Sequence, residues 1–185
     1  MERVEWAKLE YAYGKATNVS ELIRTIAFGD EAEACKACST LYDELIHQAS
    51  IYSSTGEAIP FLIEALTVAR GGPRVRLGWL GFLEDIVSSS VHWIEMENDT
   101  DLAEAGLVTC PLPRECIERV WLGSGLFARL LSNDADADVR SRAAYLLGRL
   151  LGEGPDLAPR TPPSRFASAV AALTARLRGR LPPCG

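Results

Sequence analysis

Long apolar runs, an export signal and strand patterns are all missing from this chain of 185 residues. Without a run of about 18 apolar residues, no membrane-spanning helix is expected. The amino terminus, MERVEW, is charged and has no apolar core, so export by a standard signal is not expected and the cytoplasm is the predicted compartment. No segment has a clear strand pattern, which leaves an all-helical chain as the prediction.

Histidine is scarce, and the cysteines do not form a recognisable metal pattern. The five cysteines are an odd number in a chain of this size, which favours reduced thiols that fill small apolar spaces. Cys35 and Cys38 have the spacing of a redox or zinc pair, but there is no second cysteine pair, and only His47 and His92 could complete a site. Small-residue packing within a helix is therefore the prediction, with no metal and no cofactor.

Lysine and arginine are absent from residues 77–113, although acids are frequent there. Residues 1–113 carry 18 acids and 8 bases, whereas residues 114–185 carry 7 acids and 11 bases, all of them arginine. An uncompensated acidic stretch repels nucleic acid and attracts basic partners. It is therefore a candidate docking site for a basic protein, with a solvated, partly mobile loop as the other interpretation. The candidate binding residues are Glu84, Asp85, Trp93, Glu95, Glu97, Asp99, Asp101 and Glu104.

Residues 134–151 carry the clearest pattern that is present. Short acids at the start can accept hydrogen bonds from the free N–H groups of a helix's first turn. An apolar stripe follows at spacings of four and three, which predicts an amphipathic helix. Its members are Val139, Ala143, Leu146, Leu147 and Leu150.

The same layout occurs earlier in the chain, in residues 18–48. After a loop difference of one residue, Ala34, Cys38, Leu41 and Leu45 match Val139, Ala143, Leu146 and Leu150, and Asp30 matches Asp134. Helix pairs with a shared layout are the signature of a repeat array. We therefore predict one all-α domain over residues 1–185, a short α-solenoid of three to four antiparallel helix pairs. The repeats are expected at 18–48, 54–90 and 115–151, with cap helices at 2–13 and 164–181.

Six further residues are predicted to be structural. His47 and Gln48, with the turn through Tyr52, are expected to satisfy carbonyls at a helix end, and Asp43 could orient the His47 ring. Pro60 is expected near the end of the first turn of a helix, where its missing N–H costs little. Asp134 and Arg140 are expected to connect neighbouring repeats, although a binding patch is the alternative.

The segment from Trp6 to Leu66 resembles the start of a group of bacterial HEAT-repeat proteins. The resemblance rests on Leu-Tyr-Asp-Glu-Leu-Ile-His-Gln-Ala at residues 41–49, Tyr52, Thr55 and Ala-Ile-Pro-Phe-Leu at residues 58–62. Members of this group commonly have glycine where this chain has Ala49, and generic HEAT similarity extends through residue 151. Some members lie in toxin-immunity neighbourhoods, so the resemblance implies an immunity-type protein.

Two classes of function follow. The first is a non-catalytic scaffold that binds another protein, expected to be basic, with no membrane and no nucleic acid as partner. The second is an enzyme, because some DNA glycosylases and bilin lyases also have HEAT-like architecture. The net charge of −6 disfavours the glycosylase, since such an enzyme needs a basic face for DNA.

Overall fold

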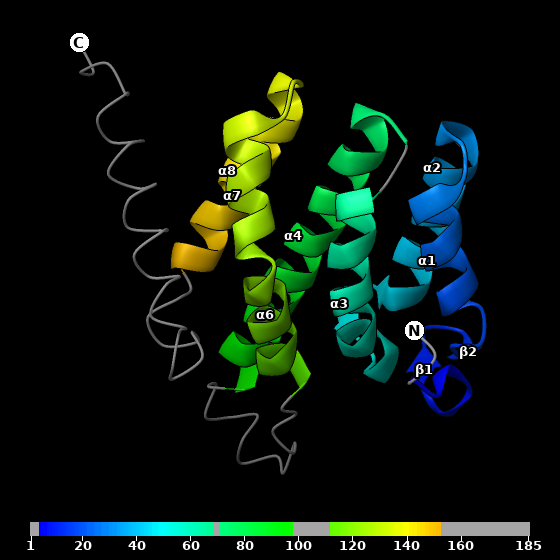
Figure 1. Cartoon of the computed structure of the whole chain (residues 1–185). Helices are drawn as coiled ribbons and strands as arrows, with labels where there is room; N and C mark the ends of the chain where they lie inside the picture. The colour runs from blue at the N-terminus through cyan, green and yellow to red at the C-terminus, as the bar shows by residue number, and fades with distance from the viewer. Residues whose placement is uncertain (1–3, 69–70, 98–111, 153–185) are drawn as a thin grey trace.

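The computed structural model describes residues 4–68, 71–97 and 112–152, and this part of the chain is mostly helical (Figure 1). The α-helices are α1 (Val19–Phe28), α2 (Glu31–Leu45), α3 (Ser53–Val68), α4 (Pro73–Glu97), α6 (Leu112–Leu122), α7 (Ser124–Asn133) and α8 (Ala137–Gly152). The expectation of a helical fold is confirmed. The helix predicted at 164–181 lies outside the described residues. No helix in the described ranges is long and apolar enough to cross a membrane.

The helices pack in two rows. In one row α1 lies against α3 and α3 against α6, and in the other α2 and α8 lie on either side of α4 (Figure 1). Contacts between α1 and α2, between α4 and α6, and between α7 and α8 connect the rows. Each α-helix therefore covers the apolar side of at least one neighbour.

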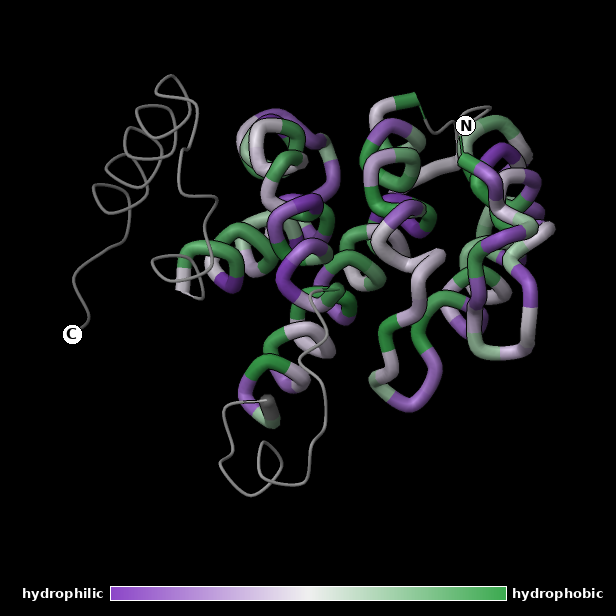
Figure 2. The backbone as a smooth tube through the Cα atoms, turned by 90° about the horizontal axis from the view of Figure 1, so that it is seen from below, coloured by the Kyte–Doolittle hydropathy of each residue, from purple (hydrophilic) through white to green (hydrophobic). Residues whose placement is uncertain are grey.

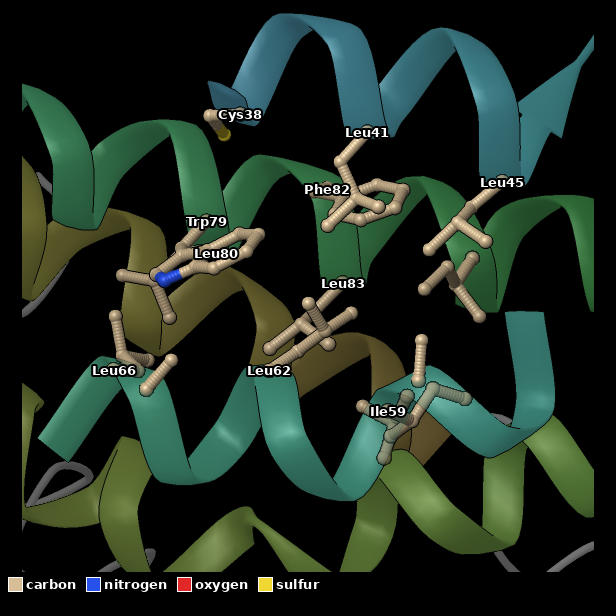
Figure 3. Packing of buried hydrophobic residues seen from close by; sticks show 14 of the residues in the cluster. Cys38, Leu41, Leu45, Ile59, Leu62, Leu66, Trp79, Leu80, Phe82 and Leu83 are labelled. Carbon is tan, nitrogen blue, oxygen red and sulfur yellow. The ribbon is translucent and has the colours of Figure 1, made fainter. Parts of the chain in front are cut away.

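Buried side chains from these helices form one hydrophobic cluster. Figure 3 shows part of it, where Leu41 and Leu45 of α2 and Leu62 of α3 converge on Phe82 and Leu83 of α4. Each of these side chains is at most 1% exposed, and burial of one contributes roughly 1.5–3 kcal/mol. Apolar and polar residues alternate along the helices in Figure 2, as expected when each helix buries only part of its circumference.

The predicted cap helix at residues 2–13 is wrong. In its place lie the short 3-10 helix η1 (Trp6–Lys8) and an antiparallel hairpin of β1 (Glu10–Tyr11) and β2 (Gly14–Lys15). Hydrogen bonds to distant residues hold this segment extended, because Ser54 Oγ donates to the Glu10 carbonyl at 2.7 Å and Ala12 N–H donates to the Glu44 carbonyl at 2.9 Å. Such contacts leave no periodic signal in the sequence.

A second hairpin lies at the end of the repeat that was predicted over residues 18–48. The helix α2 ends at Leu45, and β3 (Ile46–His47) pairs with β4 (Ser50–Ile51). The two loop residues between the strands have positive φ, 50° at Gln48 and 61° at Ala49. Left-handed backbone at both central positions is the two-residue turn that fits the twist of a hairpin, although glycine and asparagine are the usual residues there.

Two helix boundaries also differ from the prediction. The loop interpretation of residues 77–113 is wrong for residues 77–97, because α4 continues to Glu97, and α6 begins at Leu112. Within the repeat predicted at 115–151, α6 ends at Leu122 and α7 begins at Ser124, so the helix is interrupted at Gly123. A Cβ at Gly123 would lie 2.8 Å from Ile63 Cδ1 and 2.8 Å from the Phe127 ring, so the chain passes α3 too closely for a side chain.

Candidate functional site

An acidic cluster of Tyr42, Asp43 and Asp85 lies where α2 and α4 meet on the surface. The Tyr42 hydroxyl donates a hydrogen bond to Asp85 Oδ2 at 3.0 Å, and its ring lies 5.4 Å from the ring of Phe82. Tyr42 is 36% exposed, so part of the ring faces solvent. Neither carboxylate forms an ion pair within the described residues.

The environment of Tyr42 raises the pKa of its hydroxyl above the ordinary value. Partial burial is the main cause, followed by the hydrogen bond to Asp85 and the negative charges of Asp85 and Asp43. The phenolate is disfavoured first by burial and further by the two carboxylates that lie beside it. The cluster is thus a place where an added positive charge is favourable.

Glu84, the neighbour of Asp85 in sequence, has a cationic partner, although the absence of nearby bases in the sequence suggested that it has none. Arg142 of α8 donates to Glu84 Oε2 at 2.5 Å, and the Glu84 side chain is only 15% exposed. The cation comes from 58 residues further along the chain. Glu84 therefore connects α4 to α8 and adds little free negative charge to the surface.

A groove follows the surface between α4 and α8. It is lined by Leu77, Glu84, Asp138, Ser141, Arg142 and Tyr145. Tyr145 is 55% exposed, and a Cβ at Gly81 on α4 would meet nothing within 4 Å. The surface of α4 therefore has no side chain at Gly81. The aromatic residues Tyr42 and Tyr145 lie on the helices to either side, α2 and α8.

The rest of the predicted docking patch is dispersed. Trp93 is 37% exposed, and its indole N–H donates to the Ala49 carbonyl at 2.7 Å, so it supports the β3–β4 turn. Glu95 is exposed on α4. Glu97 ends α4, but its side chain is not described. Asp99, Asp101 and Glu104 lie outside the described residues.

The predicted role of His47 and Gln48 at carbonyls is wrong. His47 Nδ1 shares a hydrogen bond of 3.2 Å with the hydroxyl of Tyr13, which is on the turn between β1 and β2, and their ring centroids are 5.4 Å apart. Asp43 makes no hydrogen bond to the His47 ring. The Gln48 side chain has no hydrogen bond within the described part of the chain. His47 thus connects the two hairpins.

Thr55 satisfies the helix end instead. Its hydroxyl donates to the Leu45 carbonyl at 2.6 Å and accepts from Tyr52 N–H at 3.0 Å. This buried side chain joins the end of α2 to the start of α3. The Tyr52 and Thr55 positions of the sequence motif are therefore structural, through the backbone of one and the hydroxyl of the other.

Asp134 and Arg140 lie at the turn between α7 and α8. Arg76 of α4 reaches Asp134 through two nitrogens, at 3.0 Å from Oδ2 and 3.2 Å from Oδ1, and the Asp134 side chain is 7% exposed. Arg140 donates to the carbonyls of Asp134 and Ala135 at 2.8 and 3.0 Å. Asp134 thus connects the turn to α4, as predicted. The prediction that Arg140 connects repeats is wrong, because its hydrogen bonds lie within the turn itself.

Pro60 lies further into its helix than expected, because α3 begins at Ser53 and Pro60 is its eighth residue. Proline has no N–H, so the usual bond to the Gly56 carbonyl is missing there. Cys35 and Cys38 are free thiols, and burial raises the pKa of Cys38 to about 11, with a smaller contribution from Cys35. A thiol of such high pKa is a weak nucleophile at neutral pH. The described residues contain no group of three or more His, Cys, Asp or Glu that could hold a metal ion.

Sequence reasoning missed the residues that form the exposed surface of α2, α4 and α8. Tyr42 was not among the predicted binding residues, and Asp43 was considered only as a partner of His47. Their position next to Asp85 depends on the contact between α2 and α4, which no local pattern encodes. No family model, curated protein or solved structure matches the chain.

Proposed function

We propose that this chain is a non-catalytic protein-interaction module, built as a short HEAT-like α-solenoid, whose acidic cluster binds a basic segment of a partner protein. The observation that carries the proposal is the cluster itself. Tyr42, Asp43 and Asp85 present an aromatic ring and two carboxylates without a cationic partner among the described residues.

The packing of the helices supports the solenoid. Helices α1 and α3 are neighbours in one row, and α2, α4 and α8 are neighbours in the other, as in an array whose units contact mainly the next unit. The equivalent positions of residues 18–48 and 124–150 are also buried alike. Cys38 is 9% exposed and the position that it matches, Ala143, is 0% exposed, and Leu41 and Leu146 are both 0% exposed.

The chemistry of the cluster supports a basic partner. A guanidinium or ammonium group can donate to a carboxylate, and charge-assisted bonds of this kind are about twice as strong as neutral ones. The exposed face of Tyr42 can hold the same cation at roughly 0.5–1 kcal/mol. The groove between α4 and α8, which the exposed Tyr145 lines, gives a partner further area to contact.

The resemblance to HEAT-repeat proteins of toxin-immunity neighbourhoods supports a narrower version. In it the chain is a cytoplasmic immunity-type protein and the partner is a basic toxin domain. An arginine or lysine of that domain would bind to the acidic cluster, and the chain would then cover part of the partner's surface.

The test begins with recovery of the native complex from the source cells and identification of its components by mass spectrometry. The partner's affinity is then compared for D43K/D85K and for the control E21K/E118K, which makes the same change in charge at exposed acids on α1 and α6. We expect the first pair to weaken binding at least tenfold, about 1.4 kcal/mol, and to reduce its salt dependence. The control should stay within about twofold of wild type.

Two outcomes contradict the proposal. One is recovery of nucleic acid without a protein partner. The other is unchanged affinity and salt dependence in D43K/D85K while thermal unfolding remains normal. The Asp43 side chain makes no bond within the described residues, so the single variant D43K separates loss of charge from loss of the Tyr42–Asp85 bond.

A further inference from the structure

An apolar groove lies on the opposite row of helices, between α1 and α3. Ile23, Ala27 and Phe28 line it from α1, and Phe61, Ala65 and Val68 from α3. Two of these side chains are unusually open to solvent for their size, Phe28 at 58% and Val68 at 45% exposed. Exposed apolar side chains that line one groove form a patch that a second surface can cover.

The groove has charges of opposite sign on its two sides. Arg24 lies on α1, four residues before Phe28, and Glu64 lies on α3, four residues before Val68. Phe28 and Val68 are the last residues of their helices, so each charge is about one helical turn from the end of its helix. Both charged side chains are exposed, and neither forms an ion pair within the described residues.

We infer that this groove is the contact surface between two copies of the chain. In a symmetric dimer the same patch meets itself through a two-fold axis, so a surface with a cation on one side and an anion on the other is self-complementary. An axis through the middle of the groove places Arg24 of each copy against Glu64 of the other. The apolar floor between the charges is then covered from both sides, and two ion pairs form for each dimer.

The geometry also indicates how strong the dimer is. Helices of 10 and 16 residues are about 15 and 24 Å long and pack about 10 Å apart, so the face they share is roughly 20 Å wide. The contact area of a face with this length and width lies at or below the low end of the areas that specific protein–protein interfaces bury. A dimer that dissociates at micromolar concentrations is therefore expected, and the acidic cluster on the row of α2, α4 and α8 stays free in it.

Sedimentation equilibrium of the full chain over a range of micromolar concentrations tests the dimer directly, and charge variants test its arrangement. R24E brings two carboxylates together across the axis, and E64R brings two guanidinium groups together, so each variant alone should be monomeric. An equimolar mixture of R24E and E64R should form a heterodimer, because both contacts across the axis then join opposite charges. In one contact Glu64 of R24E meets Arg24 of E64R, as in wild type. In the other the two charges are exchanged. The double variant R24E/E64R should dimerise with about the affinity of wild type.

The exposed acid Glu118 on α6 supplies a control, since E118R should leave the dimer intact. F28S removes the apolar contact and should weaken dimerisation at least tenfold, with circular dichroism confirming that the helices remain. If the wild type is monomeric at all concentrations, the inference is wrong. The groove is then covered by another part of the chain or by a different protein. A dimer that survives R24E, E64R and F28S overturns it too, because the contact is then elsewhere.

Discussion

The turn between α1 and α2 and the turn between α7 and α8 look alike in sequence but use their aspartates differently. Asp30 caps its own helix, since its Oδ1 accepts from Glu33 N–H at 2.9 Å while the Glu33 side chain accepts from Asp30 N–H at 3.2 Å. Asp134, which the internal match pairs with Asp30, is bound by Arg76 from another helix. The cap of α8 is Asp136, whose Oδ1 accepts from Val139 N–H at 3.0 Å.

The difference comes from the length of the turn. Glu33 and Val139, the residues that donate to the two caps, lie three residues after Asp30 and Asp136. The buried stripes of α2 and α8 match with the one-residue difference that the sequence indicated. The longer turn before α8 therefore leaves Asp134 outside that helix. Because the second turn has one more residue, two aspartates divide the work there. Asp136 caps α8, and Asp134 attaches the turn to α4.

The largest effect should come from Asp134. D134A leaves the partly buried Arg76 without its carboxylate, and loss of one member of a buried pair costs roughly 3 kcal/mol or more. Urea unfolding should show this as a lower midpoint with an unchanged slope. The matched control is R74A, because Arg74 is 81% exposed and 3.9 Å from Glu31, and it should change the free energy of unfolding by less than about 1 kcal/mol. Equal effects of D134A and R74A would contradict the distinction.

The pH dependence of stability should separate the two helix pairs through Cys38, which matches Ala143. The pKa of Cys38 is about 11 in the folded protein against 9.0 for an unperturbed thiol, so folding favours the protonated form. This contribution is fully present below pH 9 and is lost as the pH rises from 9 through 11. It is on the order of 3 kcal/mol. C38A should therefore show a shallower loss of stability above pH 9 than wild type, and parallel profiles would show that the thiol is not protected.

Removal of the cap at Asp136 should have an intermediate effect. D136A leaves the N–H groups of Asp138 and Val139 without an acceptor, which costs about 1–2 kcal/mol. The same thermal or urea unfolding experiment measures it. D136N keeps an acceptor oxygen and serves as the control, with only a small loss expected. If D136A were as damaging as D134A, capping and attachment would not be separable at this turn.

The smallest effect is expected at the first turn. D30A removes the capping box of an exposed turn, and about 1 kcal/mol is expected. D30N should be close to wild type, since asparagine caps nearly as well as aspartate. A loss above about 3 kcal/mol in D30A would mean that Asp30 also has a partner across the array.

The buried faces of the helices could be predicted, and their ends could not. Leu41, Leu45, Leu146 and Leu150 were assigned correctly because amphipathic spacing is a local property. The break at Gly123 follows from the approach of Ile63, which is 60 residues away in sequence, and the hairpin at Gln48 and Ala49 is held by Trp93. No window of neighbouring residues contains that information.

The candidate site was predicted only in part. Asp85 was included, but Tyr42 and Asp43, which complete the acidic cluster, come from α2. Glu84 was taken as a free charge, since the arginine that pairs with it, Arg142, lies far along the chain on α8. Pairing across helices determines which charges remain for a partner, and it depends on how α2, α4 and α8 lie against one another.

The sequence by itself determined the helical class and which side of most helices is buried, because both depend on the spacing of apolar residues within one or two turns. It also determined that acids would cap the helices after the turns, because the first N–H groups of any helix need acceptors. Only the tertiary structure decided which aspartate caps and which one binds Arg76, where the helices break, and which acids stay unpaired. These depend on distances between side chains far apart in the chain, which are set when the helices pack.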